Sequence, residues 1–185
     1  YSNFAHKHNI PLIVDNSFAT PMLCRPFEFG ADIVTHSTTK YMDGHAVQGG
    51  GVIVDGGKFD WTKYPEKFPG LCTPDESYHG VTYTERFGLG GAFITKATAQ
   101  LMRDLGAVQS PHNAFLTNLG LESLPVRVHQ HCANAQRIAE HLQGHEKIAW
   151  VKYCGLPGDR YYELAQKYLP NGGCGVVSFE LKGGR

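Results

Sequence analysis

The stretch ADIVTHSTTKYMDGHAVQGG, residues 31–50, decides how this chain is organised. Its first part, residues 31–36, is a short and nearly continuous apolar run, typical of a strand that helices cover on both faces. Open α/β sheets bind their ligands outside the carboxyl ends of such strands. The residues that directly follow this strand are therefore the first place to look for chemistry.

Two hydroxyls and one amine follow the strand, on Ser37, Thr39 and Lys40. The hydroxyls are neutral donors for an anion, and the amine is a potential nucleophile. This combination suits a phosphorylated aldehyde cofactor, because lysine amines form Schiff bases with pyridoxal phosphate. The alternative is a solvated lysine beside hydroxyls that only cap the next turn.

A carboxylate ends an earlier apolar run. Residues 10–14 have the pattern of another buried strand, and Asp15 closes it. If both strands belong to one sheet, Asp15 and Lys40 converge at the same edge. The ring nitrogen of pyridoxal phosphate needs a carboxylate partner, which Asp15 can supply. The alternative is an ordinary turn residue, the commoner role for a single aspartate at a strand end.

Charge and cysteine content limit the class of protein. The chain of 185 residues carries 17 basic and 17 acidic side chains, so its charge favours neither nucleic acid nor an anionic membrane surface. Small molecules and other subunits are the expected partners. Its five cysteines form no CxxC pair and are odd in number, which fits a reducing compartment. Apolar runs of only strand length and the lack of a signal pattern at Tyr1 predict a cytoplasmic protein.

Periodicity places the remaining elements. A short helical step is expected at residues 25–29 and a third strand at residues 51–55. Residues 58–82, with Trp61 and three prolines, lack periodicity and predict a long surface excursion. Helices are predicted at residues 92–105, 113–124, 125–144 and 161–168, and further strands at residues 148–153 and 175–181.

Several motifs in order resemble one enzyme family, the pyridoxal-phosphate enzymes of cysteine and methionine metabolism. The matching segments are VDNSF at 14–18, RP at 25–26, GADIV at 30–34, HSTTKY at 36–41 and GH at 44–45. The resemblance covers essentially the whole chain and implies an α/β fold of the aspartate-aminotransferase type I class. It implies that residues 1–125 are the later part of the cofactor-binding large domain. Residues 126–185 are then the linking helix and the start of the C-terminal domain.

The resemblance also assigns the site. Lys40 is expected to hold pyridoxal 5'-phosphate and to move a proton between the substrate's Cα and Cβ, which requires a neutral amine and so favours a desolvated pocket. Asp15 is expected to pair with the ring nitrogen, Ser37 and Thr39 with the phosphate, and Ser17 with the ring region. The members of this family are more than twice as long. Their cofactor-stacking aromatic and phosphate loop would precede Tyr1, and their carboxylate-binding arginine would follow Arg185.

The segments at 51–61 and 74–80 are most similar to the O-acetylhomoserine sulfhydrylase branch of the family. That likeness implies γ-replacement, in which sulfide displaces acetate from O-acetylhomoserine and gives homocysteine, a step of methionine biosynthesis. It also implies a homo-oligomer, a dimer of dimers at full length. Cystathionine γ-synthase, cystathionine γ-lyase and methionine γ-lyase remain alternatives, as does an inactive structural fragment.

Three rival motifs carry less weight. Residues 37–40 satisfy the S-x-x-K pattern of serine β-lactamases, but the S-D-N and K-T-G partners of that pattern are missing from the sequence. His129 and His131 point to different faces of a helix, while His141 and His145 share a face but lack the Glu of HExxH, so no metal site is predicted. The glycines near Lys40 do not form a phosphate loop.

Overall fold

The computed structural model describes residues 1–184, and these divide into two compact units. Unit 1 comprises residues 1–15, 26–37 and 49–114, and unit 2 comprises residues 16–25, 38–48 and 115–184. The chain therefore passes between the units several times. The predicted domain boundary after residue 125 stays a prediction.

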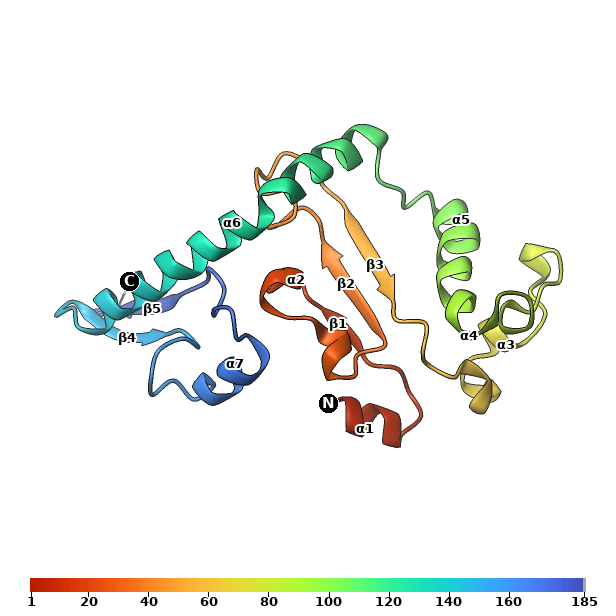
Figure 1. Ribbon diagram of the computed structural model, residues 1–185, viewed down its shortest axis with the longest axis horizontal. Helices are drawn as coiled ribbons and strands as arrows, with labels where there is room; N and C mark the ends of the chain where they lie inside the picture. The colour runs from red at the N-terminus through yellow and green to blue at the C-terminus, as the bar shows by residue number, and fades with distance from the viewer. Residues whose placement is uncertain (185) are drawn as a thin grey trace. The chain divides into compact units, whose positions relative to one another are not determined.

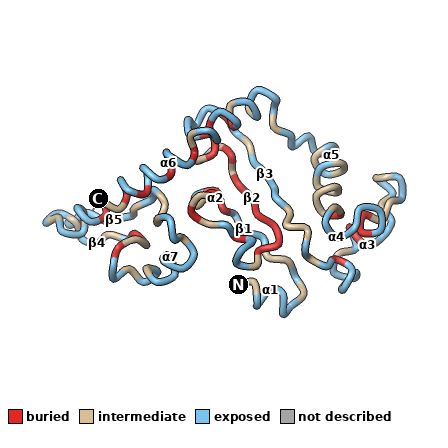
Figure 2. The backbone as a smooth tube through the Cα atoms, viewed as in Figure 1, coloured by how far each residue is buried: buried red, intermediate tan, exposed pale blue. Residues whose placement is uncertain are grey.

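Unit 1 is built on a three-stranded sheet whose order is β1-β2-β3 (Figure 1). The strands are β1 (Ile13–Asp15), β2 (Ile33–Ser37) and β3 (Gly51–Asp55). β1 is parallel to β2, and β3 is antiparallel to it. The central strand is the most buried, with Ile33 and Val34 only 1% and 2% exposed (Figure 2). The predicted buried strand before Ser37 is therefore confirmed.

The two outer strands of this sheet differ from the central one. β1 has only three residues, and Ile13 is 54% exposed, so the prediction of a buried strand over residues 10–14 is wrong in extent. β3 lies where the third strand was predicted, but four of its five residues are exposed. The side chains of a strand project from the two faces of its sheet, so this exposure means that the described residues leave both faces of β3 largely uncovered.

The predicted surface excursion at residues 58–82 is also wrong. It folds into four short helical segments: η2 (Trp61–Lys63), η3 (Pro65–Lys67), α3 (Pro69–Cys72) and η4 (Glu76–Tyr78). Trp61 and Leu71 are 3% and 7% exposed and join a core cluster with Ile33, Tyr83 and Ala92. Segments of one turn leave no periodicity in the sequence, and this explains why the pattern pointed to a loop.

A long, irregular helix follows, made of α4 (Tyr83–Thr95), the π-helical η5 (Lys96–Met102) and α5 (Arg103–Leu105). Its end is as predicted, because Gly106 takes a left-handed φ of +71°. Its start is earlier than predicted. Gly88 interrupts the helical backbone with a φ of +66°, so the sequence shows regular periodicity only after this point.

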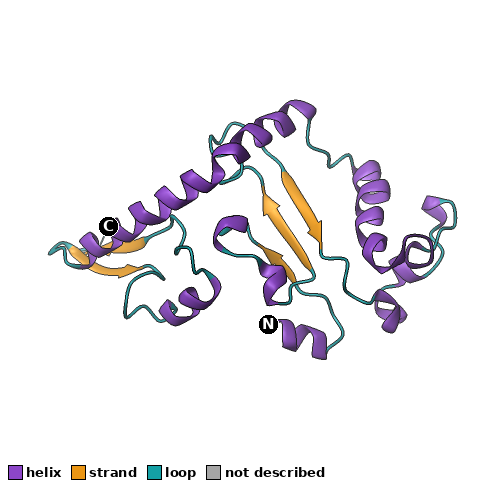
Figure 3. Cartoon of the chain, in the orientation of Figure 1, coloured by secondary structure: helices purple, strands orange, loops and turns teal. Residues whose placement is uncertain are grey.

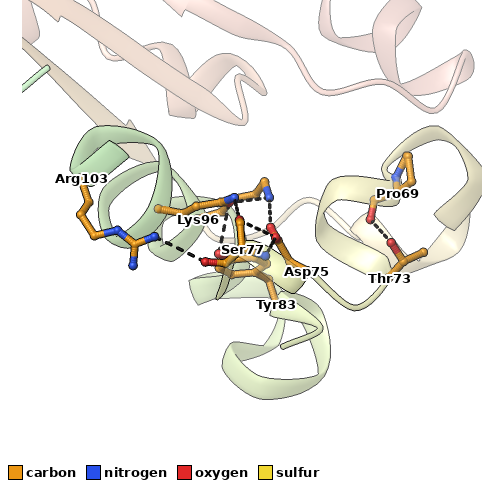
Figure 4. Close-up of polar contacts among 8 residues, drawn as sticks. Pro69, Thr73, Asp75, Ser77, Tyr83, Lys96 and Arg103 are labelled. Carbon is orange, nitrogen blue, oxygen red and sulfur yellow. Dashed lines mark hydrogen bonds and ion pairs between the residues drawn. The ribbon is translucent and has the colours of Figure 1, made fainter. Parts of the chain in front are cut away.

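η5 holds the Asp75–Gly80 turn through polar contacts (Figure 4). The Lys96 ammonium lies 2.6 Å from a carboxylate oxygen of Asp75 and 2.7 Å from the Gln100 amide oxygen. Gln100 in turn donates to the Ser77 hydroxyl. The hydrogen bond from Lys96, reinforced by the Ser77 hydroxyl, lowers the pKa of Asp75 to about 2.

Unit 2 contains α2 (Thr20–Leu23), most of α6 (Pro111–Gln143), α7 (Tyr162–Tyr168) and an antiparallel pair, β4 (Ile148–Lys152) and β5 (Ser178–Leu181). These elements confirm the two predicted strands and the helix between them, although β5 is shorter than expected. In unit 1, α1 (Ser2–Lys7) precedes β1, and η1 (Pro26–Phe29) forms the predicted helical step.

α6 runs without a break through Pro125 (Figure 3), so the predicted separation into two helices is wrong. Proline removes one backbone donor from a helix interior and disturbs the preceding turn. Here the guanidinium of Arg127 donates to the Gly120 carbonyl at 2.7 Å, in the turn that precedes the proline.

None of the helices formed by residues 1–184 combines the length and apolar character that a membrane crossing requires.

Candidate functional site

The structure places two of the predicted site residues at one edge of the sheet in unit 1. Asp15 is the last residue of β1, and Ser37 is the last residue of β2. The two strands are parallel, with Asp15 opposite Thr35, so both carboxyl ends lie at the same edge. The other three predicted residues, Ser17, Thr39 and Lys40, belong to unit 2. The predicted approach of Asp15 to Lys40 stays a prediction.

Lys40 and Thr39 line a cavity of about 440 Å³ in unit 2. The other lining residues are Phe18, Tyr41, Gly44, His45, Ala46, Arg127 and His131. Lys40 is exposed, and Thr39 is half-buried. The desolvated setting expected for the amine is thus not provided by the described residues. Ser17 is buried, at 7% exposure, and is not part of the cavity wall.

The turn that carries Lys40, residues 38–48, is closed by its own hydrogen bonds. The amide of Gly44 donates to the Lys40 carbonyl at 3.0 Å. Asp43, which is 1% exposed, accepts through its carboxylate from the backbone amides of His45 and Val47, at 3.2 and 3.1 Å. Gln48 donates to the Thr38 carbonyl at 3.1 Å and joins the two ends of the turn. The backbone at Lys40 is therefore held before any ligand binds.

α6 supports this turn from one side, at Gly120 and Arg127. A Cβ atom at Gly120 would lie 2.3 Å from the Met42 carbonyl oxygen and 2.4 Å from that of Asp43, so only glycine allows this approach. Arg127 donates through Nη1 to the Tyr41 carbonyl at 2.9 Å. Both contacts fix the turn to the helix.

Tyr41, the residue after Lys40, forms part of the cavity wall. Its ring lies edge-on to those of Phe18 and His131, with centroids 6.2 and 5.4 Å apart. Burial, and next the nearby Cys174 thiol, raise the pKa of the Tyr41 phenol above its usual value. The phenol therefore stays protonated at neutral pH and can donate a hydrogen bond.

Sequence reasoning missed Gly120, Arg127 and the packing role of Tyr41. A glycine inside an otherwise regular helical pattern is a usable signal, because it weakens the helix and so points to a packing reason such as the close approach of another backbone. No comparable signal pointed to Arg127, since it lies 86 residues from the carbonyl that it binds.

Unit 2 has a second cavity, of about 570 Å³, whose walls include Tyr153, Cys154 and Arg160. Burial raises the pKa of the Cys154 thiol and of the Tyr153 phenol, so both groups are protonated and weakly nucleophilic at neutral pH. This second cavity also has a lysine, Lys152, in its wall, whereas the cavity that contains Lys40 has the hydroxyl of Thr39 beside the amine. Within residues 1–184, no group of three His, Cys, Asp or Glu side chains is arranged to hold a metal ion.

Comparison with known proteins identifies the class. Residues 1–185 match the family described as Cys/Met metabolism PLP-dependent enzyme, and the chain belongs to that family. The resemblance found in the sequence is thereby confirmed.

Two relatives within the family show which of its members the chain resembles. The chain is 50% identical over 179 residues to the homocysteine/cysteine synthase of Kluyveromyces lactis, a match that covers 96% of this chain and 40% of that protein. It is 46% identical over 191 residues to the O-acetyl-L-homoserine sulfhydrylase of Leptospira meyeri, covering 99% of this chain and 43% of that one. The chain thus spans about two fifths of the length of these curated relatives.

A solved structure confirms the fold class. The chain superposes with a TM-score of 0.91 and 37% identity on a Campylobacter jejuni protein assigned as an O-acetylhomoserine (thiol)-lyase. The match covers 98% of this chain and 45% of that one. One lysine of the Campylobacter protein is described as N'-pyridoxyl-lysine-5'-monophosphate. The present chain therefore has the α/β fold of the corresponding part of this class of pyridoxal-phosphate enzymes.

Proposed function

We propose that the protein is a pyridoxal-phosphate-dependent sulfhydrylase that replaces the acetate of O-acetylhomoserine with sulfide and forms homocysteine, a step of methionine biosynthesis. The observation that carries the proposal is Lys40, whose side chain lines a cavity while its backbone is held in a closed turn. The relatives named as homocysteine synthases and O-acetylhomoserine sulfhydrylases support the choice of reaction.

The predicted site residues suit the cofactor in their chemistry, and two of them, Thr39 and Lys40, line a cavity. A cavity of about 440 Å³ is within the range of small-molecule sites. Lys40 would hold the aldehyde carbon, and Asp15 would bind the ring nitrogen. The Ser37 and Thr39 hydroxyls would donate to the phosphate, and Ser17 would lie near the ring. When bound, pyridoxal phosphate supplies an electron sink that stabilises negative charge at the substrate's Cα and Cβ.

Each side chain then has a defined task. With the cofactor bound, the Lys40 amine would take the proton from the substrate's Cα and then one from Cβ, and acetate would leave from Cγ. After sulfide adds at Cγ, a proton would return to Cβ and another to Cα, which gives homocysteine. Asp15, as an anion, keeps the ring nitrogen protonated. The hydroxyls of Ser37 and Thr39 orient the cofactor without adding charge. The phenol of Tyr41, protonated at neutral pH, is a hydrogen-bond donor in the same cavity wall as Lys40.

The expected subunit organisation and location belong to this proposal as well. We expect the whole protein to be a homo-oligomer, a dimer of dimers, and to act in the cytoplasm on a small amino-acid substrate and sulfide. The balanced charge of 17 basic and 17 acidic side chains agrees with small, soluble reactants.

The test is borohydride reduction of the purified protein with pyridoxal phosphate, followed by mass measurement and peptide mapping. A pyridoxyl adduct confined to the Lys40 peptide supports the cofactor assignment. Adducts spread over many lysines, or none, would show that the site is not assembled, which is the expectation for an inactive structural fragment.

The reaction itself is tested by supplying O-acetylhomoserine with sulfide, cysteine or no thiol. Homocysteine formation only with sulfide supports the sulfhydrylase. Cystathionine formation with cysteine would favour a cystathionine γ-synthase. Ammonia and a 2-oxo acid released from cystathionine or methionine would favour a γ-lyase.

A further inference from the structure

We propose that Arg127 is a positioning residue for Lys40: its guanidinium fixes the turn of residues 38–48 against α6 and so sets where the lysine amine lies in the cavity. The role of the Lys40 amine in this proposal rests on the proposed function. The mechanical part, that Arg127 holds the turn, is independent of it.

The first support is the set of hydrogen bonds that Arg127 makes. Nη1 donates to the Tyr41 carbonyl at 2.9 Å, Nη2 to the Gly120 carbonyl at 2.7 Å, and Nε to the Ser123 hydroxyl at 2.9 Å. Two of these acceptors lie on α6, and the third is the carbonyl of the residue directly after Lys40. The planar guanidinium therefore joins the helix to the turn with a fixed geometry that an ammonium cannot reproduce.

The second support is the close packing of the turn on the guanidinium. A Cβ atom at Gly44 would lie 2.5 Å from the Cζ atom of Arg127, and Gly44 has a left-handed φ of +76°. The turn thus reverses over the face of the guanidinium at a residue without a side chain. Arg127 and Lys40 both line the cavity, so a shift of the guanidinium moves the cavity wall itself.

A competing explanation is that Arg127 only stabilises the helix near Pro125. In that case, loss of the guanidinium would loosen α6 around residues 118–130 and leave the turn unchanged. The contact with the Tyr41 carbonyl predicts a different result, in which the turn loosens too. Backbone hydrogen exchange separates the two, because it reports local opening segment by segment.

The experiment compares Arg127→Met and Arg127→Lys with the matched control Arg137→Met, an exposed arginine on the same helix. Hydrogen exchange is measured by mass spectrometry on the purified protein without cofactor. For Arg127→Met we expect exchange in residues 38–48 to rise about tenfold, because charge-assisted hydrogen bonds are lost. Arg127→Lys should give an intermediate rise, and Arg137→Met no change.

The second readout is the borohydride-trapped pyridoxyl adduct. In Arg127→Met, the rate of adduct formation at Lys40 should fall about tenfold relative to the wild-type protein, with partial recovery in Arg127→Lys. If Arg127→Met does not fold, as judged by circular dichroism, exchange and Lys40 labelling are measured instead in Arg127→Lys and in Ser123→Ala, which removes one acceptor of the guanidinium.

The outcomes separate the two proposals. Faster exchange in the turn together with slower labelling of Lys40 supports the positioning role. Exchange that changes only in residues 118–130, or labelling that stays at the wild-type rate, overturns it. A wild-type protein that is never labelled at Lys40 contradicts the proposed function instead, and the role of Arg127 in holding the turn is then decided by exchange alone.

Discussion

Two turns of this chain are held against helices, and each has a lysine associated with it. One lysine holds its turn in place, and the other is carried by its turn. In unit 1, the Asp75–Gly80 turn is held by the side chain of Lys96, whose amine contacts the Asp75 carboxylate and the Gln100 amide and lies 4.8 Å above the Tyr83 ring (Figure 4). In unit 2, the turn of residues 38–48 carries its lysine, and Arg127 supplies the cation that holds it.

The comparison of Lys96 with Lys40 shows how a structural lysine differs from one whose amine can react. The amine of Lys96 has anionic, amide and aromatic partners, so it serves structure. Lys40 is exposed in a cavity, while its backbone is fixed by Gly44, Gly120 and Arg127. A held backbone that carries an amine into a cavity is one part of what a lysine nucleophile requires. The other part, desolvation of the amine, is not provided by the described residues.

Substitution of Lys40, compared with substitution of Lys96, gives the largest expected effect on cofactor labelling and activity. Lys40→Ala should abolish the pyridoxyl adduct at its peptide and lower sulfhydrylase activity by about 10³-fold or more, because the group that binds cofactor and moves the proton is gone. Lys96→Met is the matched control and should retain the adduct at Lys40. Retention of full activity in Lys40→Ala would contradict the assignment.

The core beneath the unit 1 turn can be tested through Trp61. Trp61→Ala should lower the free energy of unfolding by about 3–5 kcal/mol, because it empties a buried aromatic site. Leu105→Ala, at a position that is 77% exposed, should change it by less than about 1 kcal/mol. Urea denaturation measures both. Equal effects would mean that residues 58–82 are the surface excursion that the sequence pattern indicated.

The support beneath the unit 2 turn can be tested through Gly120. A methyl group there meets the carbonyl oxygens of Met42 and Asp43, so Gly120→Ala should cost about 1–3 kcal/mol and slow the labelling of Lys40. Gly144→Ala is the control, because a Cβ at Gly144 has nothing within 4 Å. Should the two variants denature at the same urea concentration, the close contact between α6 and the turn is not present in solution.

The ion pair of the unit 1 turn gives the smallest effect, visible only in acid. The pKa of Asp75 is lowered to about 2, against an ordinary value near 4, so its contribution to stability is complete above about pH 4. That contribution is lost as the pH falls through about 2. The unfolding free energy of Asp75→Asn should therefore fall less between pH 5 and pH 2 than that of the wild-type protein.

The double variant Asp75→Asn/Lys96→Met tests whether this effect comes from the pair. It should resemble Asp75→Asn in its acid dependence, because the titrating carboxyl is absent from both, whereas Lys96→Met should keep a smaller part of that dependence through the Ser77 hydroxyl. Additive losses from the two substitutions would instead assign the acid dependence to other groups.

The sequence by itself determined the central strand, the lysine and hydroxyls that follow it, the end of the helix at Gly106 and the family. These features depend on local chemistry and order along the chain. Strand β2 is apolar because it is buried in the middle of its sheet, and Ser37, Thr39 and Lys40 follow it directly in the sequence.

Only the tertiary structure decided the features that depend on distant contacts. Residues 58–82 form part of a core because Trp61 and Leu71 pack against Ile33 and Tyr83, which no local periodicity reveals. α6 continues through Pro125 with a side-chain bond to Gly120, and the same side chain reaches Tyr41 across 86 residues. Local pattern thus specified which groups are present. Burial and contacts between distant segments decided which side chains are packed in a core, which are bound to other residues and which are exposed.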